Sequence, residues 1–262
     1  MEYRARYTDS RRDCRVVIQS RALEWGGCGL RMTVDGVSFV GGNFCDFELD
    51  DEGQAMEAAG KFQLLKWGGY IGCGDRLLPY SYSLQRYGLE VEIPVETVRR
   101  GDGETLPGVV RLAYHMEECD RTKARCRYRC GDQTVYPDDT VCTEFSLQVD
   151  KRRFAAERPT TYFEQALLQI CEKCGDEYLL KCCFTCQYSD YSPYGCDDFG
   201  SMLCYRKHKA VYLTVNDKDG YFEKLEGLDY EIRQETNLCW EFEERTRCEG
   251  YRGAVDGKYI RR

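Results

Sequence analysis

Alternating apolar and polar residues dominate the first 150 positions of the chain and predict β-strands. The clearest case runs from Val141 to Val149, where every second residue is apolar or β-branched and so shares one face of a strand. Turn-rich segments separate the predicted strands, a spacing typical of a sandwich or a curled antiparallel sheet. The other predicted strands cover 14–19, 80–98 (broken or bulged), 109–116 and 125–129.

A β-hairpin is predicted around Asp35-Gly36. Apolar runs at 30–34 and 37–40 flank this dipeptide. Both residues tolerate the positive φ angles that a two-residue hairpin turn requires. The first part of the chain is therefore expected to contain at least one tight antiparallel pair.

Two segments repeat apolar residues with the period of a helix instead. The first is 51–65, although Gly60 weakens the pattern. The second follows Thr160 or Thr161, either of which can cap it, and Gly175 is placed to end it. Its apolar stripe consists of Phe163, Ala166, Leu167, Ile170, Cys171 and Cys174.

The change of period predicts an α+β protein in two parts. Residues 1–155 are expected to form a β-rich domain, an antiparallel sheet or a sandwich. Residues 156–262 are expected to form a cysteine-rich α+β module that binds a metal through four cysteines.

Charge and hydropathy narrow the classes of partner. The net charge of -8 argues against nucleic acid and anionic membranes, because both need a positive field, and leaves a protein partner possible. No apolar run approaches the roughly 20 residues of a membrane helix. The polar N-terminus lacks the apolar core of a secretion signal, so a cytoplasmic location is expected.

The 17 cysteines carry the strongest chemical signal. Their odd number and the absence of an export signal disfavour a disulfide framework. Reduced cysteines act either as small buried hydrophobic residues or as metal ligands. A metal site is therefore the first hypothesis to test along the chain.

Cys183-Phe184-Thr185-Cys186 has the spacing of a zinc knuckle, in which two thiolates on one turn converge on a cation. The preferred further ligands are Cys204 and Cys239, which lie in short stretches, 202–206 and 236–241, that also contain polar residues. Cys171 and Cys174 are the alternative pair, but the apolar stripe of a helix already accounts for them.

Four thiolates suit structural zinc, and an iron–sulfur cluster is the less favoured occupant. Zinc is preferred because nothing nearby suggests an electron-transfer partner. Other ligand sets that include Cys182, Cys196 or His208, or no metal at all, remain open.

The C-terminal motifs resemble the hallmark of an uncharacterised bacterial family, a domain of unknown function. The resemblance covers about 160–253 and rests on the stretch 183–195, on 199–206, on 234–242 and on the ending 250–253. It implies cysteines at the positions of Cys183, Cys186, Cys204 and Cys239. It implies no activity.

Three functions compete. The favoured one is a non-enzymatic bacterial binding protein with a structural zinc site, consistent with the acidic charge, the 20 tyrosines and the lack of catalytic motifs. The second is a hydrolase or nuclease that uses Asp190, Asp197, Asp198 or His208 near the metal. The third is a redox or metal sensor that uses the surplus thiols.

Overall fold

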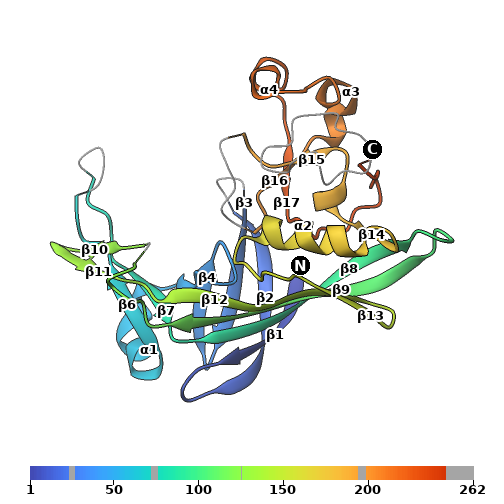
Figure 1. The fold of residues 1–262 in the computed structure, drawn as a ribbon. Coiled ribbons are helices and arrows are strands. Elements are labelled where there is room, and N and C mark those ends of the chain that lie inside the picture. The colour runs from blue at the N-terminus through green and yellow to red at the C-terminus, as the bar shows by residue number, and fades with distance from the viewer. Residues whose placement is uncertain (24–26, 72–75, 125, 194–198, 246–262) are drawn as a thin grey trace. The chain divides into compact units, whose positions relative to one another are not determined.

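The computed structural model describes residues 1–23, 27–71, 76–124, 126–193 and 199–245. Within them, one large antiparallel sheet dominates the fold (Figure 1). Its strands follow the order β13-β12-β9-β8-β1-β2-β3-β4-β5-β7-β6, and β14 pairs with β8. The strands are β1 (Glu2–Thr8), β2 (Asp13–Leu23), β3 (Gly27–Val34), β4 (Val37–Gly41), β5 (Glu48–Leu49), β6 (Gln63–Trp67), β7 (Ser81–Gln85), β8 (Gly88–Arg99), β9 (Thr105–Glu117), β12 (Asp139–Val149), β13 (Arg152–Ala155) and β14 (Tyr178–Lys181).

Two small sheets and a few helices complete the described elements. The pair β10-β11 joins Tyr128–Cys130 to Gln133–Val135, and the order β15-β16-β17 joins Ser189–Asp190, Met202–Cys204 and Glu231–Arg233. The helices are η1 (Glu52–Gln54), α1 (Ala55–Lys61), α2 (Phe163–Cys174), η2 (Cys183–Thr185), η3 (Arg206–His208), α3 (Lys209–Tyr212) and α4 (Lys218–Leu225).

The chain divides into two compact units. Unit 1 comprises 1–21, 29–91 and 112–143, and unit 2 comprises 22–28, 92–111 and 144–262. Both units draw on segments that are distant in sequence. The proposed division into 1–155 and 156–262 stays a prediction.

Local pattern correctly predicted several elements. Asp35 and Gly36 have φ angles of 49° and 79° between β3 and β4, as the hairpin requires. The break in 80–98 falls at Arg86, whose φ is 56°, between β7 and β8. In β12 the alternation buries Phe145, Leu147 and Val149.

The helix predicted at 51–65 is wrong at its C-terminal end. Helix α1 stops at Lys61, Phe62 is extended, and Leu64 and Leu65 belong to β6. Strand β6 is hydrogen-bonded to β7 along its whole length. This strand pairing stabilises the extended backbone more than the helical spacing of apolar residues favours a helix. The strand predicted at 125–129 is likewise replaced by β10, which begins at Tyr128.

Helix α2 confirms the second predicted helix. It packs against β13 and β14 and buries most of the predicted stripe, and Gly175 is its C-terminal cap. Its N-terminal cap is Tyr162, without a side-chain hydrogen bond, so the predicted capping by Thr160 or Thr161 is wrong. The Thr160 hydroxyl instead accepts from the Tyr162 backbone N–H at 3.2 Å.

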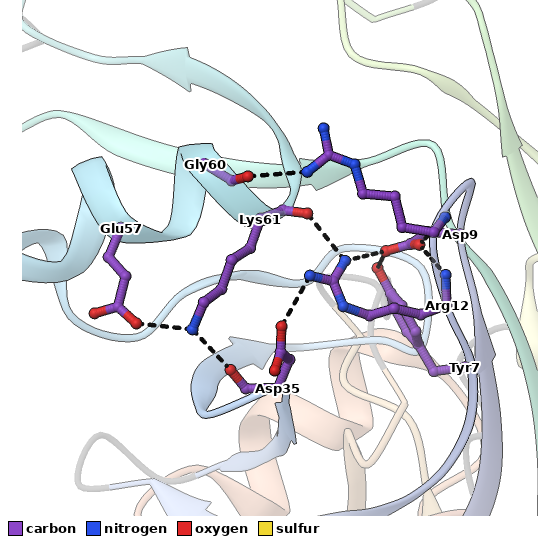
Figure 2. A network of polar contacts seen from close by, with 8 residues as sticks. Tyr7, Asp9, Arg12, Asp35, Glu57, Gly60 and Lys61 are labelled. Carbon is purple, nitrogen blue, oxygen red and sulfur yellow. Dashed lines mark hydrogen bonds and ion pairs between the residues drawn. The ribbon is translucent and has the colours of Figure 1, made fainter.

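A polar network in unit 1 fixes the end of α1 (Figure 2). The Arg12 guanidinium donates to the Lys61 carbonyl and to the carboxylates of Asp9 and Asp35, each at 2.9 Å, and lies 4.3 Å from the Phe62 ring centroid. Burial acts to raise the pKa of Asp9, but the hydrogen bonds from Arg11 and Arg12 outweigh it and lower that pKa overall. Arg12 thus satisfies a helix C-terminus and a half-buried carboxylate together.

None of the helices in the described ranges is long and apolar enough to cross a membrane.

Candidate metal and buried-acid site

Three segments of unit 2 come together around the predicted cysteines. The Phe184 N–H donates to the Glu235 carbonyl at 2.9 Å, and the Gln187 N–H donates to the Glu243 carbonyl at 2.9 Å. Strand β16 pairs Cys204 with Ser189 and with Glu231. Backbone hydrogen bonds therefore hold 183–189, 202–204 and 231–243 side by side.

The four predicted ligands lie at the junction of these segments. Cys183 begins η2, Cys186 follows η2, and Cys204 ends β16; all three are buried, whereas Cys239 is half-exposed. Burial raises the pKa of the Cys183 thiol, and the neighbouring thiols raise it further, Cys204 and Cys186 among them. The pKa of Cys204 is raised by burial and also by Cys186 and Cys239. The structure thus brings the four thiols into one electrostatic neighbourhood.

Two nitrogen donors face these sulfur atoms. The Arg206 backbone N–H donates to the Cys204 sulfur, which acts to lower the pKa of that thiol. The Asn237 side-chain amide donates to the Cys183 sulfur at 3.7 Å. Donors of this kind stabilise thiolate charge and are characteristic of the shell around metal-bound cysteines.

The side chains do not form a ready metal site as they stand. Across the described ranges, no group of three or more His, Cys, Asp or Glu side chains is arranged so that it could hold a metal ion. The four cysteines lie on neighbouring segments, and both the ligand set and the metal remain predictions.

The alternative pair lies on α2. Cys174 is buried, as the apolar stripe requires, and Cys171 is half-exposed. Burial raises the pKa of Cys171, and Cys174 and Cys182 raise it further. Cys182, another candidate ligand, acts electrostatically on Cys171 as well as on its chain neighbour Cys183.

A second cluster, of buried acids, lies on the same segments. Asp190 accepts from the Tyr212 hydroxyl and the Tyr191 N–H, each at 2.9 Å. Glu235 accepts from the Gly200 N–H at 2.8 Å and from the Tyr191 hydroxyl at 3.2 Å. Burial raises the pKa of each carboxyl to about 7, against the opposing effect of these hydrogen bonds.

Arg245 adds a buried cation to this cluster. Its guanidinium donates to the carbonyls of Cys186 and Ser189. Burial lowers its pKa, and the nearby Tyr212 and Asp190 oppose that effect. Arg245 therefore bonds to the peptide backbone at the cysteine knuckle and lies within electrostatic range of Asp190.

Sequence pattern indicated Asp190 only as a residue of the alternative hydrolase or nuclease. It gave no indication of Glu235 or Arg245, because a carboxylate and a guanidinium in a polar stretch show no sign of burial. The one available signal was Gln234-Glu235-Thr236, part of the third C-terminal motif, in which all three side chains prove to be buried.

The other predicted site residues either lie apart from the cysteines and the buried acids or fall outside the described residues. His208 pairs with Asp229 at 2.6 Å, and the pKa of Asp229 is lowered to about 2 by Lys207 and His208. This arrangement is a surface ion-pair network. Asp197, Asp198 and Cys196 fall outside the part of the chain that the structure describes.

Comparison with known proteins identifies a family. A family model described as a family of unknown function (DUF6304) matches residues 1–189. No curated protein and no solved structure matches the chain. The matched span includes Cys183 and Cys186 but ends before Cys204 and Cys239, so it supports an uncharacterised family and leaves the C-terminal motif as a prediction.

Proposed function

The chain belongs to this family of unknown function, and on that premise we propose that it is a non-enzymatic binding protein whose C-terminal segments are held by one structural zinc ion. The ligands are Cys183, Cys186, Cys204 and Cys239. The observation that carries the proposal is that backbone hydrogen bonds hold the three segments containing these four cysteines side by side.

The chemistry of the donors fits zinc. Four cysteine sulfurs form a closed tetrahedral set, and closed sets are characteristic of structural rather than catalytic zinc. One rotatable bond, χ1, separates each sulfur from its Cα, so a change of rotamer would reposition a sulfur without moving the backbone. The amide donors from Arg206 and Asn237 supply part of the stabilising shell.

The binding role is supported by the surface next to the fourth ligand. Trp240 is 87% exposed and Leu238 is 41% exposed, so large apolar side chains flank Cys239 on both sides. Tryptophan is among the residues that contribute most to protein interfaces. A zinc ion at Cys239 would hold this short turn rigid and so reduce the entropy lost when a partner binds.

The first expected result is metal content. The gently purified full-length chain should contain one zinc ion per molecule by elemental analysis. Iron accompanied by visible charge-transfer absorption would redirect the proposal to a cluster. A fully folded protein without zinc or iron would overturn it.

The second expected result concerns the partner. Trp240→Ala should retain zinc and thermal stability but weaken binding of the physiological partner on the order of 30-fold. The partner is first identified by cross-linking and affinity capture, and its affinity is then measured by calorimetry. Met56→Ala is the matched control, because Met56 is also highly exposed (93%) but lies on α1. Equal losses in the two variants, or no loss with Trp240→Ala, would contradict a role for this turn.

A further inference from the structure

A second exposed surface lies in unit 1, where β6 meets β10. We call it the basic–aromatic surface and define it by six side chains from two distant stretches of the chain. A β-bridge between Gly68 and Cys130 joins those stretches, and Figure 1 shows β6, β10 and β11 next to one another. The six residues are Lys66, Trp67, Tyr70, Tyr80, Tyr128 and Arg129.

The backbone beneath this surface is tightly constrained. The Gly68 N–H donates to the Arg129 carbonyl at 2.7 Å, and the Gly131 N–H donates back to the Gly68 carbonyl at 2.9 Å. Gly68 has a φ of 98°, and a Cβ atom there would lie 2.0 Å from the Pro79 carbonyl oxygen. Only glycine allows this close approach, which holds the segment containing Tyr80 against the end of β6.

The aromatic rings are already held in place by cations and by one another. The Lys66 ammonium lies 3.8 Å from the Tyr80 ring centroid, and the Arg129 guanidinium lies 5.3 Å from that of Tyr70. The rings of Trp67 and Tyr128 are 5.1 Å apart. Rings held in this way lose little conformational entropy when they bind a partner.

Aliphatic side chains extend the surface. Ile71 is 59% exposed and Leu77 is 61% exposed, and a β-bridge pairs the two residues. Tyrosine, tryptophan and arginine beside exposed aliphatic residues have the composition of a protein interface.

Two of the six residues that define the surface, Lys66 and Arg129, are cations, and the sequence that leads into β10 is basic. Residues 121–129 contain five arginines or lysines and no acidic residue, although the chain carries a net charge of -8. Arg121, Lys123, Arg127 and Arg129 are all exposed. The ion pairs of Lys123 with Asp120 and of Arg129 with Asp132 lie in solvent and therefore neutralise these cations only weakly.

We propose that the basic–aromatic surface docks an acidic polypeptide segment that carries apolar side chains. The cations would meet its carboxylates, and Ile71, Leu77 and Trp67 would contact its apolar residues. A single-stranded nucleic acid is the less suitable occupant because bases need free ring faces for stacking. Here Lys66 and Arg129 lie over the rings of Tyr80 and Tyr70.

Random peptides can test the proposal before any physiological partner is identified. A display library of random 12-residue peptides is selected against the full-length protein, and the affinities of enriched peptides are measured with the Lys66→Glu/Arg129→Glu variant. Arg4→Glu/Arg15→Glu is the matched control, because it makes the same charge change at exposed positions on β1 and β2. Unchanged thermal melting in each variant verifies the fold.

Enriched peptides should combine aspartate or glutamate with apolar residues. Their affinity should fall at least tenfold in Lys66→Glu/Arg129→Glu, stay within twofold in the control, and weaken as salt is added. Enrichment of neutral or basic peptides, affinity that is unaffected by Lys66→Glu/Arg129→Glu, or no enrichment at all would overturn the proposal. Binding of a 20-nucleotide oligo(dT) that the same reversal abolishes would assign the surface to nucleic acid instead. None of these outcomes depends on zinc or Trp240, so the two proposals fail separately.

Discussion

Cys204→Ser is expected to abolish zinc binding and to unfold much of residues 180–245. Cys204 lies in the middle strand of the small sheet β15-β16-β17 and adjoins the thiols of Cys186 and Cys239. The four ligands span 183–239, so one ion closes long loops, and its binding energy becomes folding energy. Apparent binding energies for structural zinc are roughly 10–16 kcal/mol, comparable with the stability of an entire domain.

Elemental analysis checks the loss of zinc, and hydrogen exchange measured by mass spectrometry checks the unfolding. The Cys204→Ser chain should contain no zinc, and amide protection should collapse across 180–245. Residues 1–150 should exchange almost as in the unaltered protein, since they contain most strands of the large sheet. Zinc retained in full by Cys204→Ser would remove Cys204 from the ligand set.

Cys174→Ser is the matched control because Cys174 is buried in the apolar face of α2. It should cost on the order of 1–3 kcal/mol, as expected for a polar atom placed in an apolar site, and should leave the metal bound. If Cys174→Ser releases the metal while Cys239→Ser retains it, the site is instead formed by Cys171, Cys174, Cys183 and Cys186.

Glu235→Gln is expected to stabilise the protein at alkaline pH and to have little effect near pH 5. The glutamine oxygen can accept from the Gly200 N–H as the carboxylate does, and its amide can donate to the Tyr191 hydroxyl. The substitution therefore keeps the hydrogen bonds and removes only the ionisable group.

The sign of the effect follows from the raised pKa of Glu235, about 7 in the folded protein against 4.5 for an unperturbed glutamate. As pH rises through this window, the unfolded chain releases its proton while the folded chain keeps it, so the free energy of unfolding falls. Well above pH 7 the ionisation of Glu235 has lowered the free energy of unfolding by its full amount, roughly 3 kcal/mol. The pKa of Asp190 is also raised to about 7, so Asp190 makes the free energy of unfolding fall with pH in the same way. This contribution stays in the Glu235→Gln variant.

Urea unfolding at several pH values between 5 and 8, with zinc in excess, measures the difference between the two proteins. Any dependence of zinc affinity on pH is common to both and cancels. The variant should become progressively more stable than the unaltered protein as pH rises. A constant difference would show that folding does not shift the pKa of Glu235, and a variant that is less stable at pH 8 would show that the folded protein stabilises the ionised carboxylate; either result would contradict the expectation.

Local pattern in the amino-acid sequence sufficed for elements whose conformation depends on near neighbours. Asp35-Gly36 specified its hairpin because two consecutive positive φ angles select such residues. The stripe from Phe163 to Cys174 specified α2 because helical period and burial agree there. Leu64 and Leu65 were misassigned because their conformation is set by pairing with β7, about 20 residues further along the chain.

The spacing of Cys183 and Cys186 singled out this region from local sequence, since a two-residue gap is a geometric requirement of a metal knuckle. Only the tertiary structure placed Cys204, on β16, next to the segments that carry Cys186 and Cys239.

The buried acid pair and the basic–aromatic surface were decided by tertiary structure alone. Asp190 and Glu235 are 45 positions apart in the sequence, and both bond to Tyr191. Nothing in their immediate neighbours shows that water is excluded from them. Lys66 and Arg129 are 63 positions apart and reach one surface through the backbone contacts at Gly68. The sequence determined the strands, turns and donor types, which follow from local chemistry, whereas burial and proximity exist only once distant segments have paired.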